Sequence, residues 1–241
     1  HPICDRVIVS LEEAYNSDQF SKPMVLFIPY YTFQAHVYSN NTEPMHFNYL
    51  ANAGLNLQAA RATRIYGQFL IDDLQAPSGI SLKNKVPRKI GYMVGYAQTF
   101  QQTGTDAVLE FAHADSTTYT NQHSELAWFS DGLPQGLPSG PNGNEIFVRV
   151  GQRINSKLEG SVAFRDRRRV SDDFPAPNDR SLDLALAYRL GTSRSVGLQY
   201  SDYREDPYTG TSTSIPGEFG GASDGQLLRR HILAISFLQA F

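Results

Sequence analysis

The sequence predicts an all-β protein, an antiparallel transmembrane β-barrel of which about ten strands are present in this chain. Three observations support this prediction. Ten segments place bulky apolar residues at every second position, which is the period of a β-strand. The connections between these segments alternate between short and long. Charged residues gather on the opposite parity, as they do where strands face a polar lumen.

The ten predicted strands are bounded by turn and loop signals rich in Gly, Pro, Asn and Asp. The clearest is Ser181–Leu190, in which every second residue from Leu182 to Leu190 is leucine or tyrosine. In chain order they are Arg6–Tyr15, Met45–Gln58, Arg64–Asp73, Arg88–Phe100, Asp106–Thr120, Glu145–Ile154, Leu158–Arg169, Ser181–Leu190, Ser195–Tyr208 and His231–Phe241.

The lengths of the connections between predicted strands alternate along the chain. Those after the second, fourth, sixth and eighth strands are about three to five residues long, and the others are roughly 11–29. Outer-membrane barrels have short periplasmic turns and long extracellular loops, whereas a Greek-key sandwich does not sort its connections in this way. The segment 16–44 could hold a short helix, and the proline-rich segment 121–144 is expected to fold over or into the barrel mouth.

Charged side chains lie on the parity opposite to the bulky apolar residues. Burying so many charges in a dry sandwich core would be very unfavourable, but a wet lumen keeps them hydrated. They are Arg6, Glu12, Arg64, Asp72, Lys89, Glu110, Arg149, Arg153, Glu159, Arg165, Arg167, Asp183 and Arg189.

The last predicted strand, His231–Phe241, ends on an aromatic residue at the apolar parity, as the closing strand of an outer-membrane barrel does. We therefore expect the barrel-assembly machinery to bind this strand. An open strand edge in lipid leaves backbone groups unpaired, so closure needs a neighbour. We expect His231–Phe241 either to lack a neighbour on one side or to pair with Arg6–Tyr15.

Composition excludes several classes of protein. The net charge of −3 gives no basic excess for nucleic-acid binding. The single cysteine, Cys4, excludes an internal disulfide framework and a cysteine-rich metal site. No run of 18 apolar residues is present for a transmembrane helix, and the mean hydropathy of −0.36 suits a barrel with a polar lumen. No phosphate loop, nucleophile elbow or cysteine–histidine metal spacing occurs, so no cofactor or metal is predicted.

Five stretches together resemble the Wzi-type capsule-assembly barrel family of Gram-negative bacteria. They are V-I-V-S-L-E-E-A-Y (Val7–Tyr15), R-I-Y-G-Q-F-L-I-D-D (Arg64–Asp73), K-I-G-Y-M-V-G (Lys89–Gly95), L-E-F-A-H-A-D-S-T-T-Y-T (Leu109–Thr120) and G-L-P-Q-G-L-P-S-G-P-N-G-N (Gly132–Asn144).

The resemblance covers most of Val7–Arg169. The later predicted strands resemble those of outer-membrane barrels in general and not of this family in particular. It implies an outer-membrane barrel of about eighteen strands with an N-terminal helical segment that closes the periplasmic end. Residues 1–241 would then be one domain, the C-terminal part of such a barrel, incomplete on its N-terminal side. The resemblance also implies that the protein holds or organises capsular polysaccharide at the cell surface without catalysis.

The densest positive run is Arg165–Arg169, at the predicted extracellular end of a strand. Guanidinium groups pair well with carboxylates and phosphates, so Arg167, Arg168 and Arg169 are candidates for binding an anionic polysaccharide or lipopolysaccharide. The alternative is that they pair with Asp172, Asp173 and Asp179 across the following loop.

Aromatic residues near the predicted extracellular rim are candidates for stacking on sugar rings. They are Trp128, Tyr119 and Tyr208. The alternative is the interfacial aromatic girdle that any membrane barrel carries.

Two carboxylates, Asp72 and Asp73, end a predicted strand and are expected to anchor the next loop. A hydrolytic pair or a hard-cation site is the alternative, but neighbouring strand residues point to opposite faces. Outer-membrane proteases use extracellular Asp and His groups, so His113, His123, Asp115 and Asp131 are also candidates.

The sequence thus predicts a non-enzymatic outer-membrane barrel that attaches or helps assemble capsular or extracellular polysaccharide. Its expected partners are that polysaccharide, outer-membrane lipid and lipopolysaccharide, and the barrel-assembly machinery, but not nucleic acid. The alternatives are a porin or transport channel and an outer-membrane hydrolase.

Overall fold

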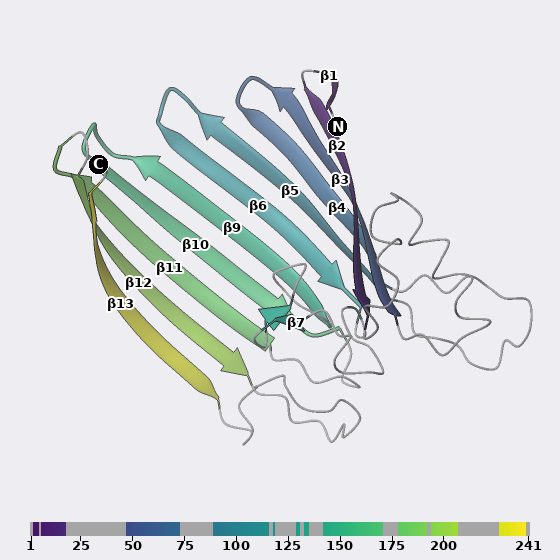
Figure 1. Ribbon diagram of the computed structural model, residues 1–241. Helices are drawn as coiled ribbons and strands as arrows, with labels where there is room; N and C mark the ends of the chain where they lie inside the picture. Colours follow the sequence, from purple (N-terminus) through teal and green to yellow (C-terminus); the bar gives the residue numbers. More distant parts are fainter. Residues whose placement is uncertain are drawn as a thin grey trace, which may run out of the picture.

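The described part of the chain is all-β and forms one large antiparallel sheet (Figure 1). The computed structural model describes residues 2–4, 6–17, 47–72, 89–115, 118, 129–130, 133–134, 142–170, 178–191, 194–206 and 227–239. Within these ranges no helix is long and apolar enough to cross a membrane. The large sheet has eleven strands in the order β1-β2-β3-β4-β5-β6-β9-β10-β11-β12-β13, and β7 pairs with β8 separately.

The strands of the large sheet follow one another in chain order. Their bounds are β1 Pro2–Cys4, β2 Val7–Ser17, β3 Phe47–Ala60, β4 Thr63–Asp72, β5 Ile90–Phe100, β6 Thr105–Ala114, β9 Gly143–Arg153, β10 Leu158–Arg168, β11 Asn178–Arg189, β12 Arg194–Asp206 and β13 Leu228–Gln239. The small hairpin is β7 Phe129–Ser130 with β8 Leu133–Pro134.

The ten long strands, β2–β6 and β9–β13, confirm the ten segments that the sequence predicts. The prediction for β6 was wrong at its end, because the strand stops at Ala114 and not at Thr120. There the Asp115 carboxylate accepts a hydrogen bond from the Ile90 amide, and the Thr118 hydroxyl donates to the Ile90 carbonyl. These side-chain bonds to Ile90 of β5 lie where the pairing of β5 with β6 ends.

The last strand was also placed too late, because β13 begins at Leu228, where it pairs with Glu205 of β12. The short strands β1, β7 and β8 were not predicted.

Short turns join the strands at one end of the sheet (Figure 1). They are residues 61–62, 101–104, 154–157 and 190–193. Gly104 adopts a φ of 67° in one of them, and in another Asn155 accepts bonds from the amides of Lys157 and Leu158. The longer connections 18–46, 73–89, 115–142, 169–177 and 207–227 leave the opposite end, which we call the long-loop end. The predicted helix within 16–44 lies outside the described residues, apart from the end of β2.

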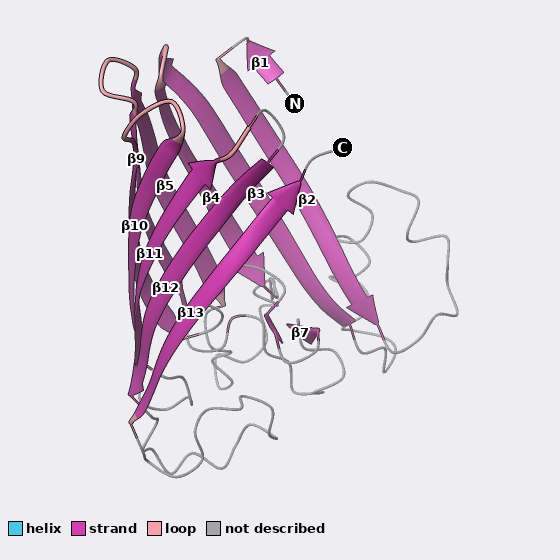
Figure 2. Ribbon diagram, turned by 90° about the vertical axis from the view of Figure 1, so that its left-hand side faces the viewer, coloured by secondary structure: helices cyan, strands magenta, loops and turns pink. Residues whose placement is uncertain are grey.

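The sheet is curved into an open trough (Figures 1 and 2). Within the described residues β13 pairs with β12 alone, and β1 and β2 lie at the other edge, so the sheet is not closed. As far as Gln239, the final strand therefore lacks a neighbour on one side, which is the first of the two expected outcomes. Phe241 lies outside the described residues.

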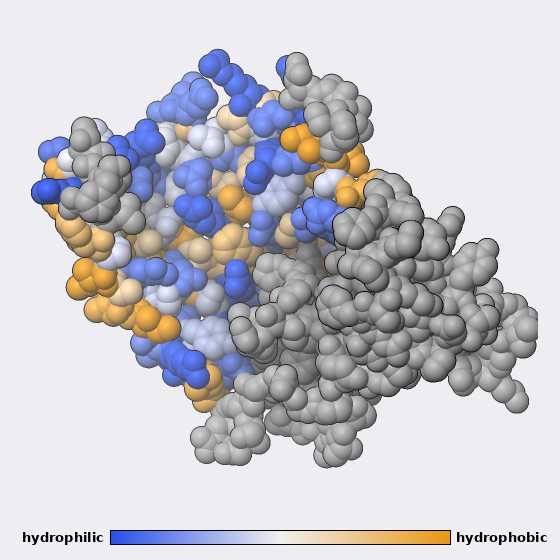
Figure 3. Space-filling model, viewed as in Figure 1, coloured by the Kyte–Doolittle hydropathy of each residue, from blue (hydrophilic) through white to orange (hydrophobic). Residues whose placement is uncertain are grey.

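The two faces of the trough differ in chemistry. The convex face carries the bulky parity, as in the in-register row Val148, Phe164 and Leu182. Large apolar side chains on this face are exposed, including Leu184 at 40% and Ile235 at 76%. The concave face is mostly hydrophilic (Figure 3). Among the described residues only Leu50, Leu70, Ala112 and Ala114 are buried hydrophobic residues, so the sheet has no packed core of its own.

Candidate functional site

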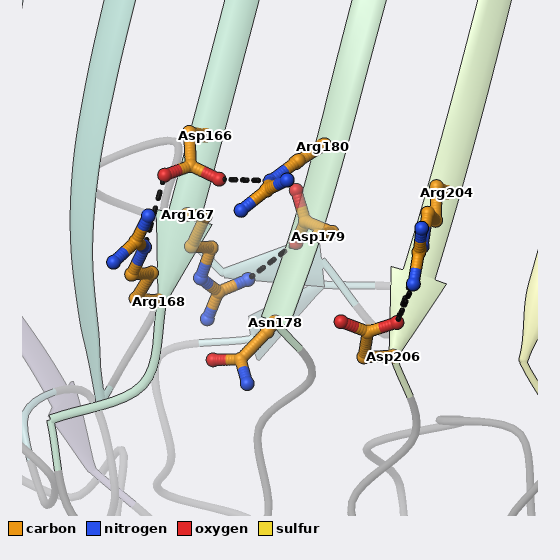
Figure 4. Close-up of a pocket in the computed structure, with 8 residues that line it drawn as sticks. All are labelled: Asp166, Arg167, Arg168, Asn178, Asp179, Arg180, Arg204 and Asp206. Carbon is orange, nitrogen blue, oxygen red and sulfur yellow. Dashed lines mark hydrogen bonds and ion pairs between the residues drawn. The ribbon is translucent and has the colours of Figure 1, made fainter.

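The candidate site lies at the long-loop end of β10, β11 and β12, beyond Phe164 and Leu182, the last apolar residues of the convex face on β10 and β11. A cavity of about 230 Å³ opens there and is lined by polar side chains only (Figure 4). Four arginines, three aspartates and one asparagine form it: Arg167, Arg168, Arg180, Arg204, Asp166, Asp179, Asp206 and Asn178. Such a set of donors and acceptors suits a charged ligand.

Strand alternation divides the predicted positive run between the two faces of the sheet. Arg165 and Arg167 share the concave face, whereas Asp166 and Arg168 share the convex face. Arg169 follows β10, and its backbone amide donates to Asn178 Oδ1 at 2.9 Å. The run therefore forms two separate groups.

The concave group is an in-register row formed by Glu145, Arg167, Asp179 and Glu205. Arg167 lies 3.7 Å from the Asp179 carboxylate, which is one of the pairings predicted as the alternative to ligand binding. Asp172 and Asp173, the other predicted partners, lie outside the described residues. A second pair joins Arg165 to Glu145 at 3.5 Å.

Burial controls the protonation of this concave group. It raises the pKa of Asp179 to about 6; the Arg167 guanidinium opposes the rise, and the Glu145 and Glu205 carboxylates add to it. Burial also raises the pKa of Glu145, against the effect of Arg165 and Arg167. The Asp179 carboxylate therefore holds its proton to a higher pH than a solvated aspartate does.

The convex group is built around Asp166 (Figure 4). This carboxylate accepts a hydrogen bond from Arg180 Nε at 2.6 Å and another from Arg168 Nε at 3.0 Å. Arg204 donates to Asp206 from both Nε and Nη2 at 3.3 Å. These arginine side chains are more than half exposed, so the group faces outward from the trough.

His113 and Asp115 close the base of the segment 115–142. His113 Nδ1 lies 2.7 Å from Asn144 Oδ1, and its Nε2 lies 3.2 Å from Asp115. Thr118 uses its hydroxyl on a backbone carbonyl. This arrangement holds the ends of β5, β6 and β9 together. The other protease-type candidates, His123 and Asp131, lie outside the described residues.

The remaining predicted site residues divide between one buried carboxylate and residues outside the described ranges. Asp72 is fully buried, and its amide donates to the Lys89 carbonyl across the base of the segment 73–88. Asp73, Trp128, Tyr119 and Tyr208 lie outside the described residues. Within the described ranges no three His, Cys, Asp or Glu side chains could hold a metal ion.

Sequence reasoning missed Arg180, Arg204 and Arg229, which lie in one row on the convex face. A signal for them exists, because each shares the parity of its strand's apolar residues and lies beyond the last of them. The predicted cluster, Arg165–Arg169, is continuous in the sequence. Arg180, Arg204 and Arg229 are far apart in the sequence and become neighbours only through strand pairing.

Comparison with known proteins identifies no relative: no family model, no curated protein and no solved structure matches the chain.

Proposed function

We propose that this chain forms part of the wall of a bacterial outer-membrane β-barrel. The observation that carries the proposal is the exposed apolar convex face of a single-layer sheet whose concave face is polar. Apolar surface in water costs about 25 cal/mol per Å², and soluble monomers rarely expose a continuous patch above a few hundred Å². A bilayer covers such a face, while a wet lumen solvates the other.

Strand dimensions support the same proposal. The ten long strands contain 10 to 14 residues each. At a rise of about 3.3 Å per residue and a tilt of about 40°, such strands span the roughly 25 Å apolar band of an outer membrane. The short turns at one end and the longer connections at the other suit a periplasmic and an extracellular side.

Labelling of single cysteines in membranes tests the proposal. In a Cys4→Ser background, Leu184→Cys lies on the convex face and Ala185→Cys is its neighbour on the concave face. With the protein inserted in vesicles, a water-soluble maleimide should label Ala185→Cys, whereas Leu184→Cys reacts only after denaturation. Equal labelling of both cysteines in vesicles would contradict a membrane-embedded convex face.

For the biological role, we propose a non-enzymatic protein that attaches or helps assemble capsular or extracellular polysaccharide. The family resemblance supports it, as does the arginine-rich cavity at the proposed extracellular end. Arg167, Arg168 and Arg169, with Trp128, Tyr119 and Tyr208, are the proposed contacts. Binding of an acidic capsular polysaccharide should saturate, with neutral dextran as the control. Equal retention of both polymers would count against this role.

A transport channel is the second candidate, and the charged concave face favours it. Arg149 lies 4.0 Å from Asp106 there, and the Tyr66 hydroxyl donates to Glu110. Rings of such charges set ion preference in pores. Steady single-channel conductance in planar bilayers would favour this candidate over a polysaccharide-holding barrel with an occluded lumen.

A further inference from the structure

We propose that four arginines on the convex face, Arg168, Arg180, Arg204 and Arg229, bind the phosphate groups of a phosphorylated glycolipid in the outer leaflet. We call them the outer arginine row. This inference rests on the proposed function, because it requires the convex face to lie in a membrane. It assigns a ligand to a surface distinct from the concave group of Glu145, Arg167 and Asp179.

Strand pairing brings the outer arginine row together. Arg180 pairs in register with Arg204, and Arg204 with Arg229, so that three adjacent strands each supply one arginine at the same level. Arg168 lies one convex-face position beyond Asp166, the partner of Arg180. Neighbouring strands are about 4.8 Å apart, so the three in-register arginines cover about 10 Å along the sheet. One row can therefore reach more than one phosphate of a headgroup.

Neighbouring carboxylates hold the guanidinium groups of the row in place but accept only some of the guanidinium N–H donors. Arg168 and Arg180 both bind Asp166 through Nε, and their terminal nitrogens have no partner within the described residues. Arg229 donates to Asp202 from Nε at 3.2 Å and from Nη2 at 3.0 Å. Because a guanidinium has five N–H donors, each arginine keeps donors for a ligand.

Exposure places the positive groups outermost. The side chains of Arg168, Arg180, Arg204 and Arg229 are 66, 56, 53 and 58% exposed, whereas Asp166 is 15% and Asp202 is 26% exposed. Asp206 is more open, at 52%. An approaching anion thus meets guanidinium groups before it meets Asp166 or Asp202.

The row lies immediately beyond the apolar part of the convex face. Asp166 is two residues from Phe164, and Arg180 is two residues from Leu182, both on the same parity. Between Leu233 and Arg229 lies His231, whose ring stacks with Tyr200 at a centroid distance of 6.2 Å. Acyl chains covering Leu182 and Leu233 would carry their headgroup to the level of the arginines.

The row is confined to one side of the sheet. Along the described lengths of β3, β4, β5, β6 and β9, no convex-face position holds lysine or arginine. A general interfacial effect would distribute basic residues around all strands. Confinement to β10–β13 indicates a site for one bound lipid, and phosphate is one of the anions that guanidinium groups bind bidentately.

The row is not explained by stability alone. Exposed ion pairs of this kind contribute only about 0–1 kcal/mol each to stability. Three strands nevertheless keep an arginine at one level, each held by a carboxylate from its own strand or a neighbouring one.

Lipid binding by the detergent-solubilised full chain tests the proposal. The probes are diphosphorylated lipid A and its dephosphorylated form, and bound lipid is counted by native mass spectrometry. The test variant is Arg180→Gln/Arg204→Gln/Arg229→Gln. The matched control, Arg64→Gln/Arg149→Gln/Arg189→Gln, removes three exposed arginines from the concave face.

We expect the wild type and the control to prefer diphosphorylated lipid A by about tenfold or more, and the test variant to lose most of this preference. Circular dichroism and the heat-dependent shift in gel mobility, which should be the same for the three proteins, check that both variants fold. Equal binding of both lipids by the wild type, or unchanged binding by the test variant, would overturn the proposal. So would displacement of lipid A by an equal concentration of soluble phosphorylated polysaccharide.

Failure of this proposal and failure of the proposed function give different results. If the cysteine labelling shows no protected convex face, the membrane proposal fails and the lipid site fails with it. If the convex face is protected and lipid A binds without phosphate preference, the lipid site alone fails.

Discussion

Arg167 and Arg168 are neighbours in the sequence but act on opposite faces of the sheet. Arg167 lies on the concave face 3.7 Å from the half-buried Asp179, whereas Arg168 is 66% exposed on the convex face. The same guanidinium chemistry therefore serves two purposes. Arg167 pairs with the Asp179 carboxylate, and Arg168 is exposed toward an anion from outside.

The raised pKa of the half-buried Asp179 predicts a pH dependence of stability. Its pKa rises from the usual 3.8 to about 6 on folding, mainly because of burial. The folded state therefore holds this proton more tightly than the unfolded state, so the contribution of Asp179 to stability falls as the pH rises from about 4 to about 6. The free energy of unfolding in urea should fall between pH 5 and pH 7.5 in the wild type. This fall should be smaller in Asp179→Asn.

Asp206→Asn is the control, because Asp206 is half exposed on the convex face. This variant should keep the wild-type pH dependence. If Asp179→Asn and Asp206→Asn had the same pH profile, the assignment of the titration to Asp179 would be wrong.

Packing between strands depends on glycines at particular positions. Tyr66 of β4 pairs with Gly95 of β5 and lays its ring over it, so a Cβ added at Gly95 would lie 2.2 Å from the ring. The ring is held in place by its hydroxyl, which donates to Glu110 of β6, and by Arg64, whose guanidinium lies 4.6 Å from the ring centroid. An aromatic ring covering a glycine on the neighbouring strand helps fix the register of curved sheets.

Gly95→Ala is expected to destabilise the protein by about 1–3 kcal/mol, because the added methyl group must displace a ring that two neighbours hold. Urea unfolding in detergent measures the loss. Gly191→Ala is the matched control, since a Cβ there has no atom within 4 Å, and its effect should stay within about 0.5 kcal/mol. Equal losses in the two variants would argue against the Tyr66 contact as the cause.

At the scale of the whole molecule, the trough exposes an apolar face that the described chain does not cover. The long strands β2–β6 and β9–β13 keep the same parity outward across the sheet, and in-register rows on this face join apolar residues such as Val150, Val162 and Leu184. Because the sheet is curved (Figure 2), the exposed apolar residues lie on its outer face. The inner face is mostly hydrophilic (Figure 3).

Arginine substitution at the middle of the apolar face measures its environment. In a bilayer, Leu184→Arg should lower the free energy of unfolding by about 2–4 kcal/mol, because the charge would lie in hydrocarbon. Ala185→Arg on the concave face should cost about 1 kcal/mol or less. Reversible unfolding from vesicles gives both values. If Ala185→Arg were the more damaging change, the membrane would lie on the other face.

The sequence alone determined the strands, their order of short and long connections and the chemistry of the two faces. Strand period and turn chemistry are local properties, so the ten long strands could be predicted within a few residues at most ends. The exception was β6, whose end at Ala114 depends on side-chain bonds from Asp115 and Thr118 to a neighbouring strand.

Only the tertiary structure decided which strand ends lie together. Asp166, Arg180, Arg204 and Arg229 are far apart in the chain, and register across β10 to β13 brings them into one row. Register arises from many cross-strand contacts acting at once, and no single segment contains that information. The same applies to the Arg167–Asp179 pair, whose burial and raised carboxyl pKa depend on neighbouring strands.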